Sequence, residues 1–186
     1  MQHFGLPTRL LDWTESPLVA AFFAVTYERR DSDAAIWCLS PADLNESTTG
    51  RPSIALLGHE RVCELLRPAF LGGASPDITV AVASQEVDLR MAVQQSAFTL
   101  HGGPTALESH PMADRFLRKF IIPAADREGW RRELWLLGIR RSMLFPDIQN
   151  LARELSHEWS HKGREARDGS HNSAWEPLPK DSGAKL

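Results

Sequence analysis

Polar side chains that could hold an anionic ligand crowd the opening of the chain, just ahead of a long apolar segment. They are His3, Thr8, Arg9, Asp12, Trp13 and Thr14. Ser16 and Pro17 predict a helix start there, because serine caps free N–H groups and the fixed φ of proline suits the first helical turn. A helix start carries partial positive charge, and Arg9 adds a fork of donors. The segment therefore predicts a site for phosphate or pyrophosphate.

The same residues also fit a purely structural interpretation. Arg9 would then pair with Asp12, Trp13 would pack in the core, and Thr14 or Ser16 would only cap the helix. The sequence leaves both interpretations open.

The elements that must position these side chains follow from hydrophobic patterning. A helix from Pro17 to about Arg29 has a body, LVAAFFAV, that is apolar on every face, so we expect it to be packed on all sides. We expect strands over residues 35–39, 78–83, 98–100 and 117–122, helices over 126–137 and 146–159, and a surface loop over 42–53. In the helix over 126–137, Trp130, Leu134 and Leu137 share one face and are expected in the core. Together these elements predict an α+β fold, with a small mixed or antiparallel sheet around a buried helix.

Composition bounds the domain organisation and the class of ligand. The chain has 186 residues, 42% of them hydrophobic, which suffices for one core. We expect a single domain over residues 1–159 and a disordered polar tail over 160–186, where apolar residues are scarce. The formal net charge is −3, so the chain has no excess of basic residues that would indicate binding to nucleic acid.

Membrane insertion and disulfide chemistry are not expected either. The longest apolar run, Leu18 to Val25, falls far short of the ~20 residues that span a bilayer. Cys38 and Cys63 lie in separate apolar contexts, so we expect both to be buried in a reduced, cytoplasmic protein.

Four segments resemble those of a known family. Residues 2–25, QHFGLPTRLLDWTESPLVAAFFAV, closely resemble the signature block of the FRG domain, a bacterial and phage module named for a Phe-Arg-Gly motif. The resemblance continues through RMAVQQSAFT at 90–99, KFIIP at 119–123 and LGIRRSMLFPDI at 137–148.

The layout of that family is similar to that of ADP-ribosyltransferases, which implies a fold of that kind and a pocket for NAD or another nucleotide. The resemblance places Thr14 in the middle element of the site and Gln95 in the third, where the transferases carry a catalytic carboxylate. It also assigns His3, Thr8, Arg9, Asp12 and Trp13 to the nucleotide-binding side. An amide such as that of Gln95 cannot supply the negative charge that stabilises a cationic ribose.

The family's Phe-Arg-Gly block lies upstream of the matched segment, whereas this sequence starts at Met1. We therefore expect an N-terminally truncated portion of the domain that is catalytically inactive by itself. The alternative is a non-catalytic module that binds a protein partner in a phage-defence or toxin setting.

A further alternative is a zinc-dependent hydrolase. His157, Glu158 and His161 satisfy the H-E-x-x-H pattern, whose histidines bind zinc while the glutamate activates water. The motif straddles the expected end of a helix, and no scaffold for a third ligand follows it. His101-Gly102-Gly103-Pro104 resembles an oxyanion-hole loop, but no G-x-S-x-G motif accompanies it, so a turn is the better interpretation.

Overall fold

The computed structural model describes residues 8–26, 31–71, 76–84 and 88–146. The chain divides into two units, residues 1–146 and 147–186, and every described residue belongs to the first. The expected helix over 146–159, the H-E-x-x-H motif and the polar tail therefore lie outside the described residues.

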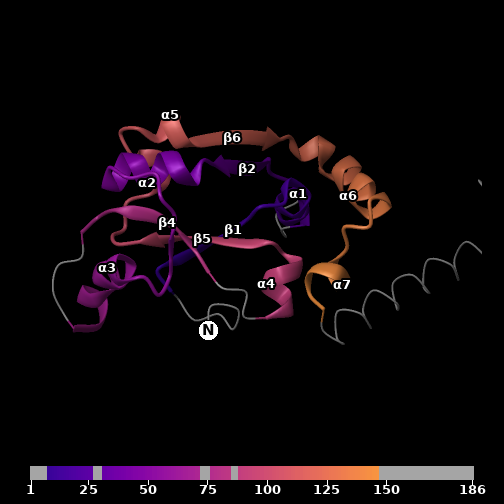
Figure 1. Ribbon diagram of the computed structural model, residues 1–186. Helices are drawn as coiled ribbons and strands as arrows, with labels where there is room; N and C mark the ends of the chain where they lie inside the picture. Colours follow the sequence, from indigo (N-terminus) through magenta and orange to yellow (C-terminus); the bar gives the residue numbers. More distant parts are fainter. Residues whose placement is uncertain (1–7, 27–30, 72–75, 85–87, 147–186) are drawn as a thin grey trace, which may run out of the picture. The chain divides into compact units, whose positions relative to one another are not determined.

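The strands form two sheets (Figure 1). The four-stranded sheet has the order β1 (Leu10–Thr14), β5 (Ser96–His101), β4 (Thr79–Ala83), β3 (Ala55–Leu56), and the two-stranded sheet pairs β2 (Ala34–Leu39) with β6 (Leu117–Ile122). Only β3 and β4 run parallel; the other pairs are antiparallel. The expected α+β fold with a small mixed sheet is confirmed.

Seven helices accompany the strands in the described part of the chain. They are α1 (Pro17–Thr26), α2 (Pro41–Thr49), α3 (Glu60–Leu71), α4 (Leu89–Val93), α5 (Ala113–Phe116), α6 (Arg127–Leu136) and α7 (Arg141–Leu144). Short 3₁₀ turns precede α5 at Leu107–Ser109 and α6 at Ala124–Asp126. None of these described helices combines the length and apolar character that crossing a bilayer requires.

Alternation along β4 gives the four-stranded sheet a core on each face. Val80 and Val82 pack with Val62 of α3, whereas Ala81 points the other way and packs with Leu44 of α2. Figure 1 accordingly shows α2 and α3 on opposite faces of this sheet. The expected strand over 78–83 is confirmed as a central strand buried on both faces.

The segment expected as a loop over 42–53 contains a helix, so that prediction is wrong over most of its length. Pro41 stands in the first turn of α2, and Gly50 ends the helix with a φ of 73°. Asn45, only 3% exposed, anchors α2 to β4: its Nδ2 donates to the Ala81 carbonyl (3.0 Å), and its Oδ1 accepts from the Ala81 N–H (2.7 Å). Asn45 thus serves as a buried partner for a strand residue.

Helix α1 begins at Pro17 as expected, with the Ser16 Oγ accepting a hydrogen bond from the Val19 N–H (3.4 Å). Its buried face packs against β6, α6 and α7 through Ile122, Leu134 and Leu144. The expectation of packing on all sides is wrong, because Leu18 and Phe23 are 39% and 41% exposed.

The carboxyl end of α1 meets two arginines of α6. The Val25 carbonyl accepts hydrogen bonds from Arg127 (3.2 Å) and from Nε of Arg131 (2.9 Å). Positive charge there satisfies open carbonyl groups and opposes the negative end of the helix dipole.

Other burial predictions are also corrected. Cys38 and Cys63 are both exposed, because Cys38 lies on the face of β2 opposite the packed Trp37, and Cys63 is turned away from the core residue Val62. In α6, Leu134 is buried, but Trp130 is exposed, and so is Leu137 just after the helix.

The Asn45 anchor predicts a loss of stability on Asn45→Ala. The substitution leaves the buried N–H and C=O of Ala81 without partners, so we expect the free energy of unfolding to fall by about 2–4 kcal/mol in urea titrations. Glu46→Gln is the matched control, because Glu46 makes only an exposed ion pair with Arg115 and should cost less than about 1 kcal/mol. Equal losses in the two variants would contradict the anchoring role.

Candidate functional site

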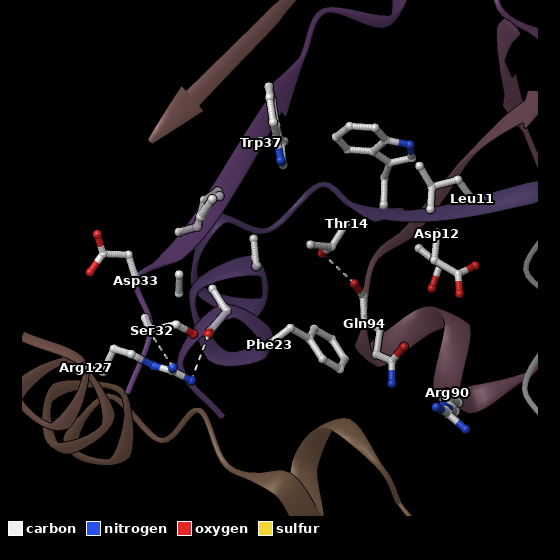
Figure 2. Close-up of a pocket in the computed structure, with 17 residues that line it drawn as sticks. Leu11, Asp12, Thr14, Phe23, Ser32, Asp33, Trp37, Arg90, Gln94 and Arg127 are labelled. Carbon is white, nitrogen blue, oxygen red and sulfur yellow. Dashed lines mark hydrogen bonds between the residues drawn. The ribbon is translucent and has the colours of Figure 1, made fainter. Parts of the chain in front are cut away.

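A cavity of about 760 Å³ lies between β1, α1 and β2, with the turn from α4 to β5 and the start of α6 completing its wall. Figure 2 shows these side chains around it. The lining residues are Leu11, Asp12, Trp13, Thr14, Ala20, Phe23, Ala24, Ser32, Asp33, Ala34, Ala35, Ile36, Trp37, Arg90, Gln94, Ser96 and Arg127.

The β1 wall of the cavity is fixed by pairing with β5, in which Thr14 lies opposite Ser96. The Thr14 hydroxyl donates to the Gln94 carbonyl (2.7 Å) and accepts from the Ser16 N–H (3.1 Å). The ladder is extended by the Glu15 N–H, which donates to the Gln95 carbonyl (2.9 Å). Thr14 therefore joins β1, the α4–β5 turn and the start of α1.

Gln94 closes the cavity toward α7. Its side chain is 9% exposed, and its Nε2 donates to the Leu144 carbonyl (2.9 Å). On the same side, the ring of Phe23 packs edge-to-face on Phe145, with centroids 5.9 Å apart.

The opposite side of the cavity is held by Arg127, which is 4% exposed. Its guanidinium donates to the Ser32 carbonyl (3.0 Å), as Figure 2 shows, and also to the Val25 carbonyl (3.2 Å). The neighbouring Asp33 accepts a hydrogen bond from the Ala124 N–H (2.9 Å). These contacts fix the segment between α1 and β2. The terminal N–H groups of Arg127 are thereby used in hydrogen bonds to backbone carbonyls.

The structure separates the expected site residues. Asp12, Trp13 and Thr14 line this cavity, whereas Thr8 and Arg9 line a second hollow of about 550 Å³ with His101 and Gly102. Arg9 there donates to the Gly102 carbonyl (2.6 Å). Five residues of extended chain span about 17 Å, so Arg9 and Thr14 lie at opposite ends of β1.

The remaining two expected residues are not placed in the cavity. Gln95 is exposed, adopts a φ of 48° and is not among the lining residues, whereas its neighbour Gln94 is. His3 lies outside the described residues.

The start of α1 is already capped by side chains. Thr14 Oγ1 accepts a hydrogen bond from the Ser16 N–H, and Ser16 Oγ accepts one from the Val19 N–H. Fewer of its donors are therefore open to an anion than the sequence indicated.

Several lining residues were missed from the sequence, namely Phe23, Asp33, Trp37, Arg90 and Ser96. Arg90 and Ser96 stand within the block at 90–99 that resembles the FRG domain, so that block was the signal that could have found them. Trp37 and Asp33 carry no motif, and only the docking of β2 beside α1 brings them to the cavity.

A chain of polar side chains leads from Trp13 through the four-stranded sheet to His101. The Trp13 Nε1–H donates to Thr99 Oγ1 (3.0 Å), which lies 3.0 Å from His101 Nε2, and His101 Nδ1 lies 3.2 Å from Thr79 Oγ1. Burial lowers the pKa of His101 below its ordinary value of 6.5, because desolvation disfavours the imidazolium. Neutral His101 can donate through one ring nitrogen and accept through the other.

The turn after His101 requires glycine. A Cβ atom on Gly102 would lie 2.1 Å from the Pro76 carbonyl oxygen, and one on Gly103 would lie 2.1 Å from Asp77 Oδ1. The Gly102 N–H is itself bound to the Ile78 carbonyl (2.8 Å). The glycines thus allow the chain to pass closely over the segment that leads into β4.

Comparison with known proteins gives one family. The FRG domain matches residues 1–33 of the chain. The curated proteins and the solved structures give no match. Among the described residues, no group of three His, Cys, Asp or Glu side chains is placed to hold a metal ion.

The burial of His101 predicts acid sensitivity. Its pKa is lower in the folded chain than in the unfolded chain, so the stabilisation is complete above about pH 6.5 and is lost as the pH falls through the folded-state pKa. One such group changes the free energy of unfolding by up to about 1.4 kcal/mol per pH unit. We expect His101→Gln to flatten the dependence of stability on pH below 6.5 in urea titrations.

His59→Gln is the control for this measurement, because His59 is an exposed histidine. It should leave the acid slope of the wild type unchanged. An unchanged slope in His101→Gln would contradict the assignment.

Proposed function

We propose that this chain is an FRG-type, ADP-ribosyltransferase-like domain that binds NAD or a related nucleotide in the cavity between β1, α1 and β2. The observation that carries the proposal is the composition of that one cavity, which gathers aromatic rings, carboxylates, hydroxyls and two arginines. Its volume falls in the range of roughly 300–1,000 Å³ that is typical of small-molecule sites.

The aromatic side chains suit the base of a nucleotide. Trp37 and Phe23 reach the cavity from β2 and α1, and Phe23 is 41% exposed overall. Every nucleobase has a π-face, and stacking on an aromatic ring contributes about 1–3 kcal/mol per base.

The polar side chains suit a ribose. Asp12 and Asp33 are exposed carboxylates on the cavity wall, and carboxylate oxygens accept hydrogen bonds from ribose hydroxyls. Ser96, opposite Thr14 in the ladder, adds a hydroxyl that can donate or accept. These groups do not attract phosphate, so the anionic part of the ligand belongs near a cationic side chain.

We propose binding without turnover. In the transferases, the third element of the site carries a catalytic carboxylate, whereas in this chain it supplies the neutral amides of Gln94 and Gln95. The Thr14 hydroxyl already makes hydrogen bonds with the Gln94 carbonyl and the Ser16 N–H. A neutral amide does not offset the positive charge that develops on the ribose as nicotinamide leaves.

A second candidate is a non-catalytic protein-binding module. The exposed apolar side chains of Leu11, Leu18 and Phe23 favour it, because apolar surface next to a cavity is typical of protein contacts. Such a module gives no saturable binding of NAD or ADP-ribose.

Calorimetric titration tests the nucleotide-binding proposal. We expect saturable binding of NAD and ADP-ribose to the chain, weakened about tenfold in Asp12→Asn, which removes a charged acceptor. Trp37→Leu should weaken binding about 5- to 100-fold, because it removes the stacking surface.

Arg9→Gln is the matched control, because Arg9 lies in the second hollow and not in the cavity. It should bind with wild-type affinity. Absence of binding to the wild type, or loss of binding in Arg9→Gln alone, would refute the proposal.

Nicotinamide release tests the absence of turnover. Chromatography of NAD incubated with the purified chain should show no nicotinamide above the protein-free rate. Sustained release that disappears in Asp12→Asn would contradict this part of the proposal and identify a working carboxylate.

A further inference from the structure

Arg90 lines the cavity with a guanidinium that has no hydrogen-bond acceptor in the described structure. The side chain is half-buried, and its Nε is fully buried without a hydrogen-bond partner. A guanidinium carries five N–H donors and is always charged. Because Nε is buried, the terminal N–H groups of Arg90 are the donors that an occupant of the cavity can reach.

The guanidinium of Arg90 is held in place by a ring. Its Cζ lies 4.6 Å from the ring centroid of Phe145, which follows α7. Stacking of this kind uses the face of the guanidinium and leaves its N–H edges for hydrogen bonds. The Gln94 hydrogen bond to the Leu144 carbonyl keeps α4 and α7 together at this point.

A second positive charge stands on the same ring. The Arg141 Cζ lies 4.9 Å from the Phe145 centroid. Positive charge from two side chains is therefore gathered around Phe145.

The other arginines of the two hollows are committed elsewhere. Arg127 donates to the carbonyls of Ser32 and Val25, and Arg9 donates to that of Gly102 in the second hollow. In Figure 2, Arg90 lies beside Gln94, with Phe23 between it and Arg127. Arg90 is therefore the cationic side chain of the cavity whose donors face no protein acceptor within the described residues.

We propose that Arg90 binds the phosphate or pyrophosphate group of a nucleoside diphosphate-type ligand. This inference rests on the proposed nucleotide site and assigns the side chain that binds the anionic part of the ligand. Guanidinium and phosphate match geometrically, because two parallel N–H groups can donate to two phosphate oxygens. The aromatic and carboxylate residues then face the base and the ribose.

Titrations with three probes test the proposal: ADP-ribose, inorganic pyrophosphate and adenosine. We expect Arg90→Gln to weaken ADP-ribose and pyrophosphate binding about 10- to 100-fold and to leave adenosine binding within about twofold. Arg90→Lys keeps the charge but loses the planar fork, so we expect an intermediate loss.

Arg132→Gln is the matched control, because Arg132 is an exposed arginine on α6 and does not line the cavity. It should bind all three probes like the wild type. Circular dichroism and melting curves establish that each variant is folded. Weaker pyrophosphate binding to the wild type at higher salt supports an ionic grip and does not depend on any variant.

The outcomes separate this inference from the function on which it rests. ADP-ribose binding that is insensitive to both Arg90 substitutions overturns the role of Arg90 and leaves the nucleotide site standing. Pyrophosphate binding that is lost in Arg90→Gln, without any binding of ADP-ribose or adenosine, overturns nucleotide binding and supports the anion grip. A wild type that binds none of the probes overturns both.

Discussion

The pairing of β1 with β5 is the constraint on which the rest of this structure depends. It sets Thr14 opposite Ser96, and the Thr14 hydroxyl extends the contact to the Gln94 carbonyl and to the Ser16 N–H. Three elements far apart in sequence, β1, the α4–β5 turn and α1, are thereby fixed around one point. The cavity lies where they meet, so its polar wall is a product of backbone pairing over some eighty residues of sequence separation.

Local signals in the sequence were sufficient for much of the fold. Ser16 and Pro17 mark the start of α1, and Pro123 marks the end of β6, because capping and proline act on their immediate neighbours. Helix α2 was missed because its Asn, Ser and Thr residues are typical of loops. It forms since Pro41 and Gly50 delimit it and Asn45 is satisfied by Ala81, a partner that no local pattern reveals. The exposure of Phe23 likewise depends on what packs beside α1.

The site was predictable only in part, for the same reason. Asp12 and Thr14 are two residues apart in sequence, and both line the cavity. Arg9 is also near in sequence, but the extended strand places it at the far end of β1, where its guanidinium donates a hydrogen bond to the Gly102 carbonyl. Residues that are close in sequence stay close in space in a turn, but an extended strand carries them apart. Arg90, which lines the cavity, comes instead from α4, the helix that precedes the strand paired with β1.

The central claim is that one cavity, built by β1, α1, β2 and the α4–β5 turn, holds the ligand. A crystal structure of the chain with ADP-ribose tests it most directly. The account predicts ligand density between Asp12 and Trp37, with the pyrophosphate within hydrogen-bond distance of the Arg90 guanidinium. Density in the hollow of Arg9 and His101, with this cavity empty, would contradict it.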